Sequence, residues 1–520
     1  MKKLVALVLA LLTLAMPCLS MAVEYPVNAD ETVVIWKVLD GSIAEGGYTT
    51  SMDTPGFKAW VEAAGINVTL QEYADNNALL LAIAGASTLP DAYMINKSSY
   101  AGGVMGMVAD DITIEITPEM LTENAPDYWE YVNNDTYLSE IVQIDGNMYG
   151  LAGHVFEPGS VYRYWRGLFY RGDLLEKVNK EVPKTADELY ELLVALKGLD
   201  GVTTPMVFQG KDDLRESLRN GDLTSPFGLV CADDYQVDGK WHFGAYEPEY
   251  KEVLRFVKKL FDEGLISVDY LSMEGSVAQA AICNGEAGAF YGNNSRLNTF
   301  KNSLKDGEYF VPGAPLQTAD GQRAMYSYAD PMVAPGDAMY ITPDCKNPEL
   351  VLKLYNFLYT EKGRLIRDMG IEGESYTMVD GVPTYTDLVT HNPDGYSLDG
   401  VARSYALINW PGIHGDNQLR QRHPEQTQVD AYMLWGDTDH DKYVVSPEDV
   451  VLDEYTDEYA SLWIDIELYI NESRAKFING ELDIDKDWDN YISTLQTMGM
   501  DRVYEIKQQT LDAYATAFDG

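Results

Sequence analysis

The feature that most constrains the fold of this chain is an alternation of short strands and helices near its N-terminus. Strands are predicted where β-branched and apolar residues run together or alternate with polar ones, as in residues 32–39 (TVVIWKVL) and 67–73 (NVTLQEY). Apolar runs over residues 55–64 and 76–86 predict helices, and residues 92–95 add a third strand. This order predicts a parallel sheet with right-handed crossovers.

Helix signals continue along the chain and accumulate at its end. Residues 185–188 (TADE) form a capping box before a helix that reaches Lys197. Further helices are predicted over residues 247–263, from 347 to about 362, and in several pieces from 446 to about 518. The fold class is therefore α/β with a helix-rich C-terminus. Because 520 residues exceed one ordinary core, at least two large lobes are expected.

The first 22 residues have the pattern of a signal peptide. Lys2 and Lys3 precede an apolar run from Leu4 to Met16, and Ser20 and Ala22 are small residues before a cleavage site. We therefore expect an exported mature chain that begins at residue 23. The residues before Cys18 do not match a lipoprotein signal, which disfavours a lipid anchor at Cys18. The sequence still leaves that anchor open.

Charge narrows the classes of partner. The chain has 82 acidic and 38 basic residues, a net charge of −44, which disfavours nucleic acid and anionic membranes. It also carries 36 tyrosines, 14 phenylalanines and 9 tryptophans, an unusual aromatic content. The mature cysteines, Cys231, Cys283 and Cys345, are odd in number and widely spaced. They predict neither a disulfide framework nor a metal site.

Six segments in chain order carry a family resemblance. They are residues 32–40, residues 89–91 (LPD), residues 145–151 (DGNMYGL), residues 168–175 (LFYRGDLL) with 183–193, residues 282–291 (ICNGEAGAFY), and residues 357–363 with 369–376 (MGIEGESY). In this order they resemble the family-1 extracellular solute-binding proteins that deliver sugars to ABC importers, and most closely the large branch related to maltose-binding protein. Asn147 stands where the family motif has lysine.

The resemblance implies a type II periplasmic-binding-protein-like fold of two α/β lobes joined by three hinge crossings. The crossings are expected near residues 152–160, 308–316 and 364–372. Lobe 1 would hold residues 23–155 and 312–366, and lobe 2 residues 156–311 and 367–520. The ligand would lie in the crevice between the lobes, which would close by a hinge motion.

The function that the resemblance implies is oligosaccharide capture without catalysis, at the extracellular face of the cell membrane or in the periplasm. It implies membrane permease subunits of an ABC importer as partners, a monomer, no catalytic residue, and no cofactor. Nucleic acid is not expected as a partner.

The strongest ligand-binding candidates follow from sugar chemistry, in which apolar faces stack on aromatic rings and hydroxyl groups bond to planar polar side chains. Residues 162–166 (YRYWR) place three rings and two guanidinium groups at the predicted entry to lobe 2. We predict ligand contacts for Trp165 and Arg166, the alternative being a loop whose rings pack on the hinge. Trp410 lies in an irregular polar stretch, with a structural loop staple as its alternative.

The remaining candidates stand at places that face the ligand in relatives. They are Asp40, Asn96, Ser98, Phe227, Asn293 and Asn294. Asp40 has the alternative of a simple turn at the end of a strand. Trp60, Trp129, Trp463 and Trp488 occupy helix-like apolar positions and are predicted to be core.

No metal site is predicted. Acids at 437, 439, 441 and 448 match EF-hand spacing, but Lys442 replaces the glycine that the sharp turn needs. Residues 198–210 also lack the Asp- and Asn-rich calcium loop of larger relatives.

Two other functions stay open. A secreted glycoside hydrolase would need two carboxylates roughly 5–10 Å apart, a pair that a chain this acidic could supply. A receptor for peptides or other polar solutes could use the same fold.

Overall fold

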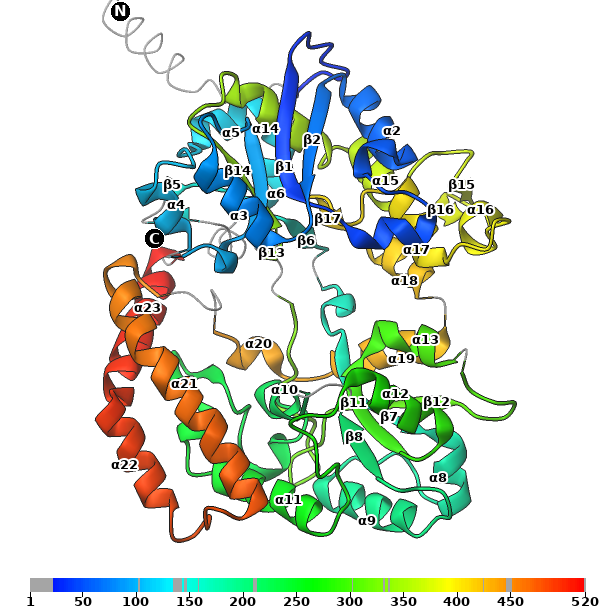
Figure 1. Ribbon diagram of the computed structural model, residues 1–520, viewed down its shortest axis with the longest axis vertical. Helices are drawn as coiled ribbons and strands as arrows, with labels where there is room; N and C mark the ends of the chain where they lie inside the picture. The colour runs from blue at the N-terminus through cyan, green and yellow to red at the C-terminus, as the bar shows by residue number, and fades with distance from the viewer. Residues whose placement is uncertain are drawn as a thin grey trace, which may run out of the picture. The chain divides into compact units, whose positions relative to one another are not determined.

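The computed structural model of the protein describes most of the chain in two compact parts (Figure 1). The described residues are 22–101, 103–133, 143–144, 147–157, 159–208, 213–301, 303–330, 333–334, 337–423, 425–445 and 451–518. Residues 1–21 of the predicted signal peptide and Glu448 lie outside them, as do the side chains of Ser98 and His154. Unit 1 consists of Met1–Phe156 with Val333–Gln418, and unit 2 of Glu157–Met332 with Leu419–Gly520.

The two units differ from the expected lobes at two of the three crossings. Residues 312–332 lie in unit 2 and residues 367–418 in unit 1, the reverse of what we expected. The first difference arises because β12 (Phe310–Gly313) pairs with β7 (Arg166–Arg171). The second arises because α17 (Leu398–Tyr405) packs on α2 (Pro55–Ala64) of unit 1.

Unit 1 is built on a sheet in the order β14-β3-β1-β2. Its strands are β1 (Thr32–Val38), β2 (Asn67–Tyr73), β3 (Ala92–Asn96) and β14 (Asp337–Ile341). β1 pairs in parallel with β2 and β3, as predicted, whereas β14 runs antiparallel to β3. The LPD segment has a local role, because the Asp91 carboxylate accepts a hydrogen bond of 2.8 Å from the Val34 amide of β1.

Helices and small sheets surround this sheet. The helices of unit 1 are α2, α3 (Asn76–Gly85), α4 (Gly103–Ala109), α5 (Pro118–Asn124), α6 (Pro126–Val132), α14 (Pro348–Phe357), α15 (Glu361–Met369), α16 (Asp387–Thr390) and α17, and α18 (Asp416–Arg422) spans the third crossing. The short strands are β4 (Gln143–Ile144), β5 (Asn147–Met148), β6 (His154–Phe156), β13 (Val333–Ala334), β15 (Tyr376–Val379), β16 (Val382–Tyr385) and β17 (Ile413–His414). Strands β13, β6 and β17 form one sheet next to the three crossings.

One predicted helix is divided in the structure. The run from 347 to about 362 was expected to end at Gly363, but α14 ends at Phe357 and α15 begins at Glu361. The division arises because the Thr360 hydroxyl accepts a hydrogen bond from the Gly363 amide and so caps a new helix.

Unit 2 is built on a second sheet, in the order β12-β7-β11-β8. β11 (Ala289–Asn293) runs antiparallel to β7 and parallel to β8 (Met206–Phe208). β9 (Asp234–Val237) and β10 (Lys240–Phe243) form a separate two-stranded antiparallel sheet.

The helices of unit 2 include the one that the capping box predicts. They are α8 (Gly172–Val178), α9 (Ala186–Lys197), α10 (Asp213–Arg219), α11 (Tyr250–Asp262), α12 (Gly275–Asn284), α13 (Leu297–Lys301), α19 (Gln426–Trp435), α20 (His440–Tyr443), α21 (Thr456–Asn479), α22 (Trp488–Met498) and α23 (Met500–Phe518). The capping box at Thr185 and Glu188 is confirmed, with both of its hydrogen bonds present. In the described part of the chain, no helix has both the length and the hydrophobicity to cross a membrane.

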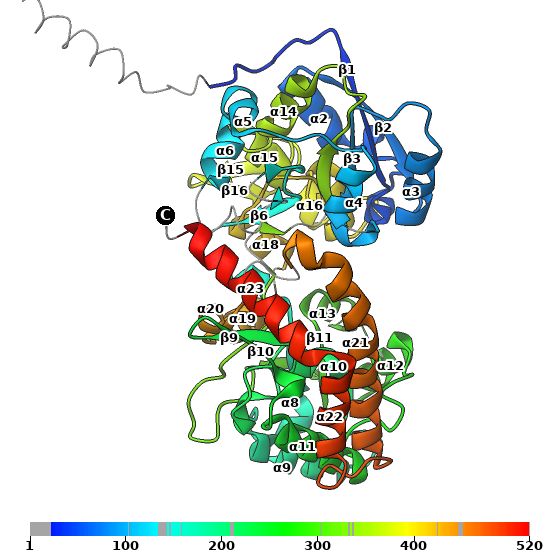
Figure 2. The ribbon, with the colours of Figure 1, turned by 90° about the vertical axis from the view of Figure 1, so that its left-hand side faces the viewer.

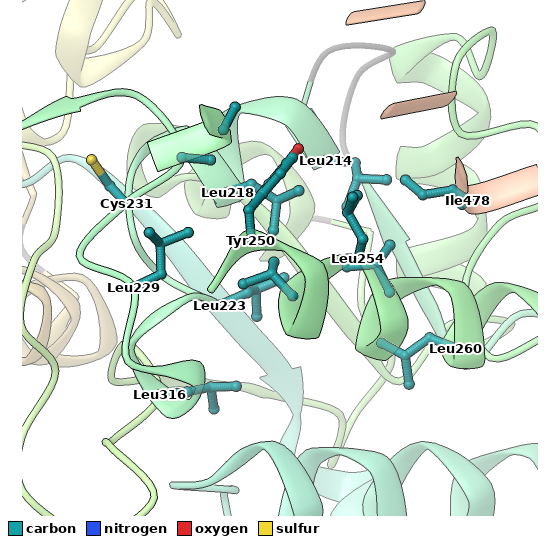
Figure 3. Packing of buried hydrophobic residues seen from close by; sticks show 14 of the residues in the cluster. Leu214, Leu218, Leu223, Leu229, Cys231, Tyr250, Leu254, Leu260, Leu316 and Ile478 are labelled. Atoms are coloured by element: carbon teal, nitrogen blue, oxygen red, sulfur yellow. The ribbon is translucent and has the colours of Figure 1, made fainter. Parts of the chain in front are cut away.

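The C-terminal helices belong to the core of unit 2. α21 packs on α11, α22 and α23 (Figure 2). Leu254 and Leu260 of α11, Ile478 of α21 and leucines of the 214–229 segment belong to one buried cluster, part of which Figure 3 shows. Trp488 also belongs to this core, as predicted, and Trp463 packs against it. The predicted C-terminal helices are therefore the outer layer of an α/β unit and not a separate tail.

Candidate functional site

One edge of the unit 2 sheet gathers the predicted aromatic and arginine residues with carboxylates from elsewhere in the chain. β7 begins at Arg166 and pairs there with Asn293, the last residue of the antiparallel strand β11. α10 follows β8 in the chain and begins at Asp213, whose carboxylate reaches Arg166. Polar groups that follow the ends of β8 and β11 therefore lie beside Trp165, which directly precedes β7.

Trp165 is held from two sides. Its indole Nε1–H donates a hydrogen bond of 3.0 Å to Oδ1 of Asp330. The guanidinium carbon of Arg166 lies 4.6 Å from the centre of the ring, within the range of a cation–π interaction. The side chain is neither fully buried nor fully exposed. Its orientation is thus set before any ligand arrives, which lowers the entropy cost of stacking a ligand on it.

Arg166 is bound by the acids that surround it. Its Nη1 lies 3.5 Å from Oδ1 of Asp213, and the two side chains are 24% and 13% exposed. Its buried Nε has no hydrogen-bond partner among the described residues. Asp222, which is 1% exposed, interacts electrostatically with the same guanidinium, and burial raises the pKa of its carboxyl well above the usual value.

Asp330 contacts the segment that precedes β7. Its backbone amide donates 3.0 Å to the carbonyl of Arg163, and Arg163 Nε donates to the carbonyl of Asp330. Burial raises the pKa of the Asp330 carboxyl, an effect that Trp165 and the two arginines oppose. We call Trp165, Arg166, Asp213 and Asp330 the Trp165 platform.

Asn293 and Asn294 have different environments. The half-buried Asn293 accepts 2.9 Å hydrogen bonds from the amide and hydroxyl of Ser295. Asn294 is fully buried, and its side-chain amide donates to the carbonyl of Gln428 in α19. The expected ligand contact of Asn294 stays a prediction that the structure does not favour, because its buried side chain joins two elements. Its backbone amide instead supports the platform with a 2.9 Å hydrogen bond to the carbonyl of Trp165.

Phe227 lies on the core of unit 2. Its ring centre is 5.3 Å from that of Phe256 in α11, and its half-buried side chain packs on the hydrophobic cluster there. Contact between Phe227 and a ligand stays a prediction.

Unit 1 presents a polar edge where its strands end. Asp40 follows β1, accepts hydrogen bonds from the amide and hydroxyl of Ser42, and takes a third from the amide of Asn409. Asp40 is thus the cap of a short helix, as its alternative interpretation predicts, although it is not fully buried. Asn96 ends β3 and is half-buried. Ser98 follows in a short 3-10 helix, but its side chain lies outside the described part.

Trp410 is a core residue of unit 1. Its ring centre lies 4.9 Å from that of Trp60 and 5.8 Å from that of Phe57, and the residue is 6% exposed. The predicted ligand contact stays a prediction, but the structure does not favour it, because the irregular stretch packs the indole on α2 against two other rings. The alternative, a staple for the loop, describes it better, although the ring packs on α2 and not on the last helices.

A buried ion pair that sequence reasoning missed lies beside Trp410. Lys37 Nζ is 4.0 Å from Glu72 and 5.3 Å from the Trp410 ring centre, and Lys37 is 6% exposed. Glu72 also accepts hydrogen bonds from the hydroxyls of Thr50 and Ser51. The pair joins β1 and β2 to the segment before α2, so it positions the loops at this edge. The only sequence signal for this ion pair is Lys37 itself, a charged residue within the otherwise mainly apolar strand β1.

The acids with EF-hand spacing meet basic side chains. Arg323 forms ion pairs with Asp437, at 2.7 Å, and with Asp439, which Lys442 also reaches at 2.7 Å. Across the described ranges, no group of three His, Cys, Asp or Glu residues could hold a metal ion. The three mature cysteines are unpaired, and two of them are buried.

A small pocket lies in unit 2, but no candidate residue lines it. Its lining consists of Arg219, Asn220, Cys231, Asp233, Asp234, Tyr326, Tyr328 and Val445. Ion pairs join Arg219 to Asp233 and Lys507 to Asp234, so the charges there are already compensated. We therefore place the candidate site at the sheet edge, where the Trp165 platform lies.

Comparison with known proteins agrees with this architecture. Lipoprotein LipO of Bacillus subtilis is 24% identical over 472 residues, 86% of each chain. The fructooligosaccharide ABC transporter substrate-binding protein FusA of Streptococcus pneumoniae is 25% identical over 378 residues, 66% of this chain and 64% of its own.

Solved structures show the same two-lobed fold. FusA in complex with kestose has a TM-score of 0.71 at 18% identity, covering 94% of this chain and 100% of its own. The alginate-binding protein AlgQ2 without calcium ion has a TM-score of 0.70 at 22% identity, with the same coverage. Residues 46–365 match the family described as bacterial extracellular solute-binding protein. This chain therefore belongs to the bacterial extracellular solute-binding proteins.

Proposed function

We propose that this protein is the exported substrate-binding protein of an ABC importer and that it captures an oligosaccharide without changing it chemically. The family membership supports a solute-binding role, and the relative FusA is a fructooligosaccharide-binding protein. The observation that carries the sugar assignment is the Trp165 platform, an oriented and partly exposed indole with carboxylates at its rim.

The proposed contacts follow from the chemistry of sugars. The apolar face of a pyranose or furanose ring packs on Trp165, which offers a large rigid surface. Sugar hydroxyls donate to carboxylate oxygens of Asp213 and Asp330 and to the amide oxygen of Asn293, all of which are acceptors. From unit 1, we propose Asp40 and Asn96 for the remaining hydroxyl groups. No bond of the sugar is broken in this scheme.

Calorimetry with the mature chain, residues 23–520, tests the proposal. We expect at least one oligosaccharide of three to five units to bind in a one-to-one complex, while short peptides do not bind. Binding of peptides without binding of any sugar would replace this proposal with the peptide receptor.

A reducing-end assay on the same mixtures tests the absence of catalysis. We expect no new reducing ends after prolonged incubation with the bound sugar. Sustained release of new ends would favour a glycoside hydrolase instead.

The proposal also has consequences for assembly and location. We propose that the mature protein is a monomer at the extracellular face and that it delivers its ligand to membrane permease subunits. Light scattering after gel filtration measures the mass of the mature chain, and mass spectrometry of the exported protein shows whether Cys18 is retained with lipid.

A further inference from the structure

We infer that the oligosaccharide is neutral and that Asp213 and Asp330 determine this specificity by compensating the charge of Arg166 in the Trp165 platform and of the neighbouring Arg163. The inference rests on the proposed function and names the substrate class of the same site. It is not a property of the fold, because FusA and AlgQ2, whose names refer to fructooligosaccharide and alginate binding, share the fold equally well.

Arg166 of the platform and the neighbouring Arg163 both interact with acidic residues. Arg166 forms its ion pair with Asp213 and contributes its guanidinium face to Trp165. Arg163 donates through Nε to the backbone carbonyl of Asp330, and both arginines interact electrostatically with the Asp330 carboxyl. Asp222 also interacts electrostatically with Arg166.

Acidic groups are at least as numerous as the arginines that they interact with at this platform. Two guanidinium groups interact with three carboxyl groups, Asp213, Asp222 and Asp330. Burial favours the neutral form of Asp222, and with that residue uncharged the remaining acids still equal the arginines. The net charge of the whole chain, −44, adds a repulsive background for an acidic sugar.

A uronate makes a demand that this arrangement does not meet. Its carboxylate loses water on binding and needs a charged donor, preferably a guanidinium that binds both of its oxygens. Asp213 already contacts one nitrogen of Arg166, with Nη1 at 3.5 Å from its Oδ1, and so reduces the charge that a uronate would meet. A neutral sugar, in contrast, offers hydroxyl donors to the same carboxylates. The negative charge of these carboxylates repels a uronate and therefore favours the neutral sugar.

The test compares neutral and acidic sugars on the wild-type mature protein. Calorimetry would use tri- to pentasaccharides of fructose, glucose, mannose and xylose, together with oligogalacturonates and oligomannuronates of equal length. We expect the best neutral sugar to bind at least about 100-fold more tightly than any uronate, because placing like charges together is costly.

The variant Asp213→Asn sharpens the test by releasing Arg166 while keeping the size of the side chain. We expect uronate affinity to rise about tenfold and neutral-sugar affinity to fall, because a charged acceptor for a sugar hydroxyl is lost, so that the neutral-to-uronate ratio drops by more than about tenfold. Asp238→Asn is the matched control, because Asp238 is exposed in the β9–β10 turn of the same unit at φ 52°, a conformation that asparagine tolerates. The control should leave both affinities unchanged.

The outcomes separate this inference from the proposed function. Uronate binding equal to or tighter than neutral binding in the wild type would overturn the inference and leave oligosaccharide capture intact. An unchanged neutral-to-uronate ratio in Asp213→Asn would show that Asp213 does not set specificity. Failure of every sugar to bind a protein with intact circular dichroism would overturn the proposed function itself.

Discussion

Two tryptophans, Trp165 in unit 2 and Trp410 in unit 1, look alike in sequence and differ in the structure. Both come from irregular segments and both were predicted to contact the ligand. Trp165 is partly exposed and its Nε1–H is bound by Asp330, whereas Trp410 is 6% exposed and packed on Trp60 and Phe57. An aromatic residue in a loop therefore does not define a binding site by itself. We propose that the hydrogen bond to Asp330 and the partial exposure of the ring together distinguish Trp165 as a binding residue.

The largest expected effect that separates the two residues is the stability of unit 1. Trp410→Ala leaves a cavity against two rings and should lower the free energy of unfolding by about 3–5 kcal/mol. Urea unfolding followed by circular dichroism and tryptophan fluorescence measures it, with Trp165→Ala as the matched control. A loss below about 1 kcal/mol would mean that Trp410 is not part of the core.

An acid dependence of unit 2 should be the next largest effect. Burial lowers the pKa of His440 from 6.5 to about 4, and its ring stacks on Tyr326 while its Nδ1 bonds to the carbonyl of Ser327. Tyr326 and Ser327 shortly precede Asp330 in the chain, so His440 supports the segment that carries Asp330 of the platform.

The sign of that dependence follows from proton uptake. Between pH 6.5 and about 4 the unfolded chain binds a proton at this histidine and the folded chain does not. Unfolding is therefore favoured as the pH falls through this window, by roughly 3 kcal/mol in total. Urea midpoints measured at several pH values should show the slope, and His440→Gln should reduce it. An unchanged slope in the variant would assign it to other groups.

Removal of the platform ring should affect binding and spare stability. Trp165→Ala is expected to weaken the bound oligosaccharide by about 1.5–3 kcal/mol, roughly 10- to 100-fold, because a stacked aromatic contact is lost. The free energy of unfolding should change by less than about 1 kcal/mol, in contrast to Trp410→Ala. Equal affinity of wild type and variant in calorimetry would remove Trp165 from the site.

The smallest expected effect concerns the brace and not the ring. Asp330→Ala removes the acceptor of the indole Nε1–H and should weaken binding by about 1 kcal/mol, roughly fivefold. Asp330→Asn keeps an acceptor oxygen and should restore most of the affinity. If both variants bind like the wild type, the orientation of Trp165 does not depend on this hydrogen bond.

Local patterns predicted the elements of the fold well. Residues 67–73 and 55–64 match β2 and α2, and Thr185 and Glu188 form the predicted capping box. These features depend on side chains a few residues apart, which the sequence displays directly. The helix predicted through 362 was divided at Thr360, a cap that an apolar pattern obscures.

Partners distant in sequence were not predictable in this way. Asp330 lies 165 positions from Trp165, and Asp213 lies 47 positions from Arg166. Asn294 and Trp410 were placed in the site by their neighbours in sequence, yet contacts with Gln428 and with Trp60 bury them. Lys37 and Glu72 pair across two strands with no local motif to announce them.

By itself, the amino-acid sequence determined the α/β class, the helix-rich end, the acidic character and the family, since periodicity, caps, charge and motifs are all local or additive properties. Tertiary structure alone decided that Trp165 is partly exposed and Trp410 is buried in the core. It also decided which acidic residues surround Arg166. The reason is physical: the exposure and pairing of a side chain depend on every group that packs within a few ångströms of it, and those groups come from distant parts of the chain.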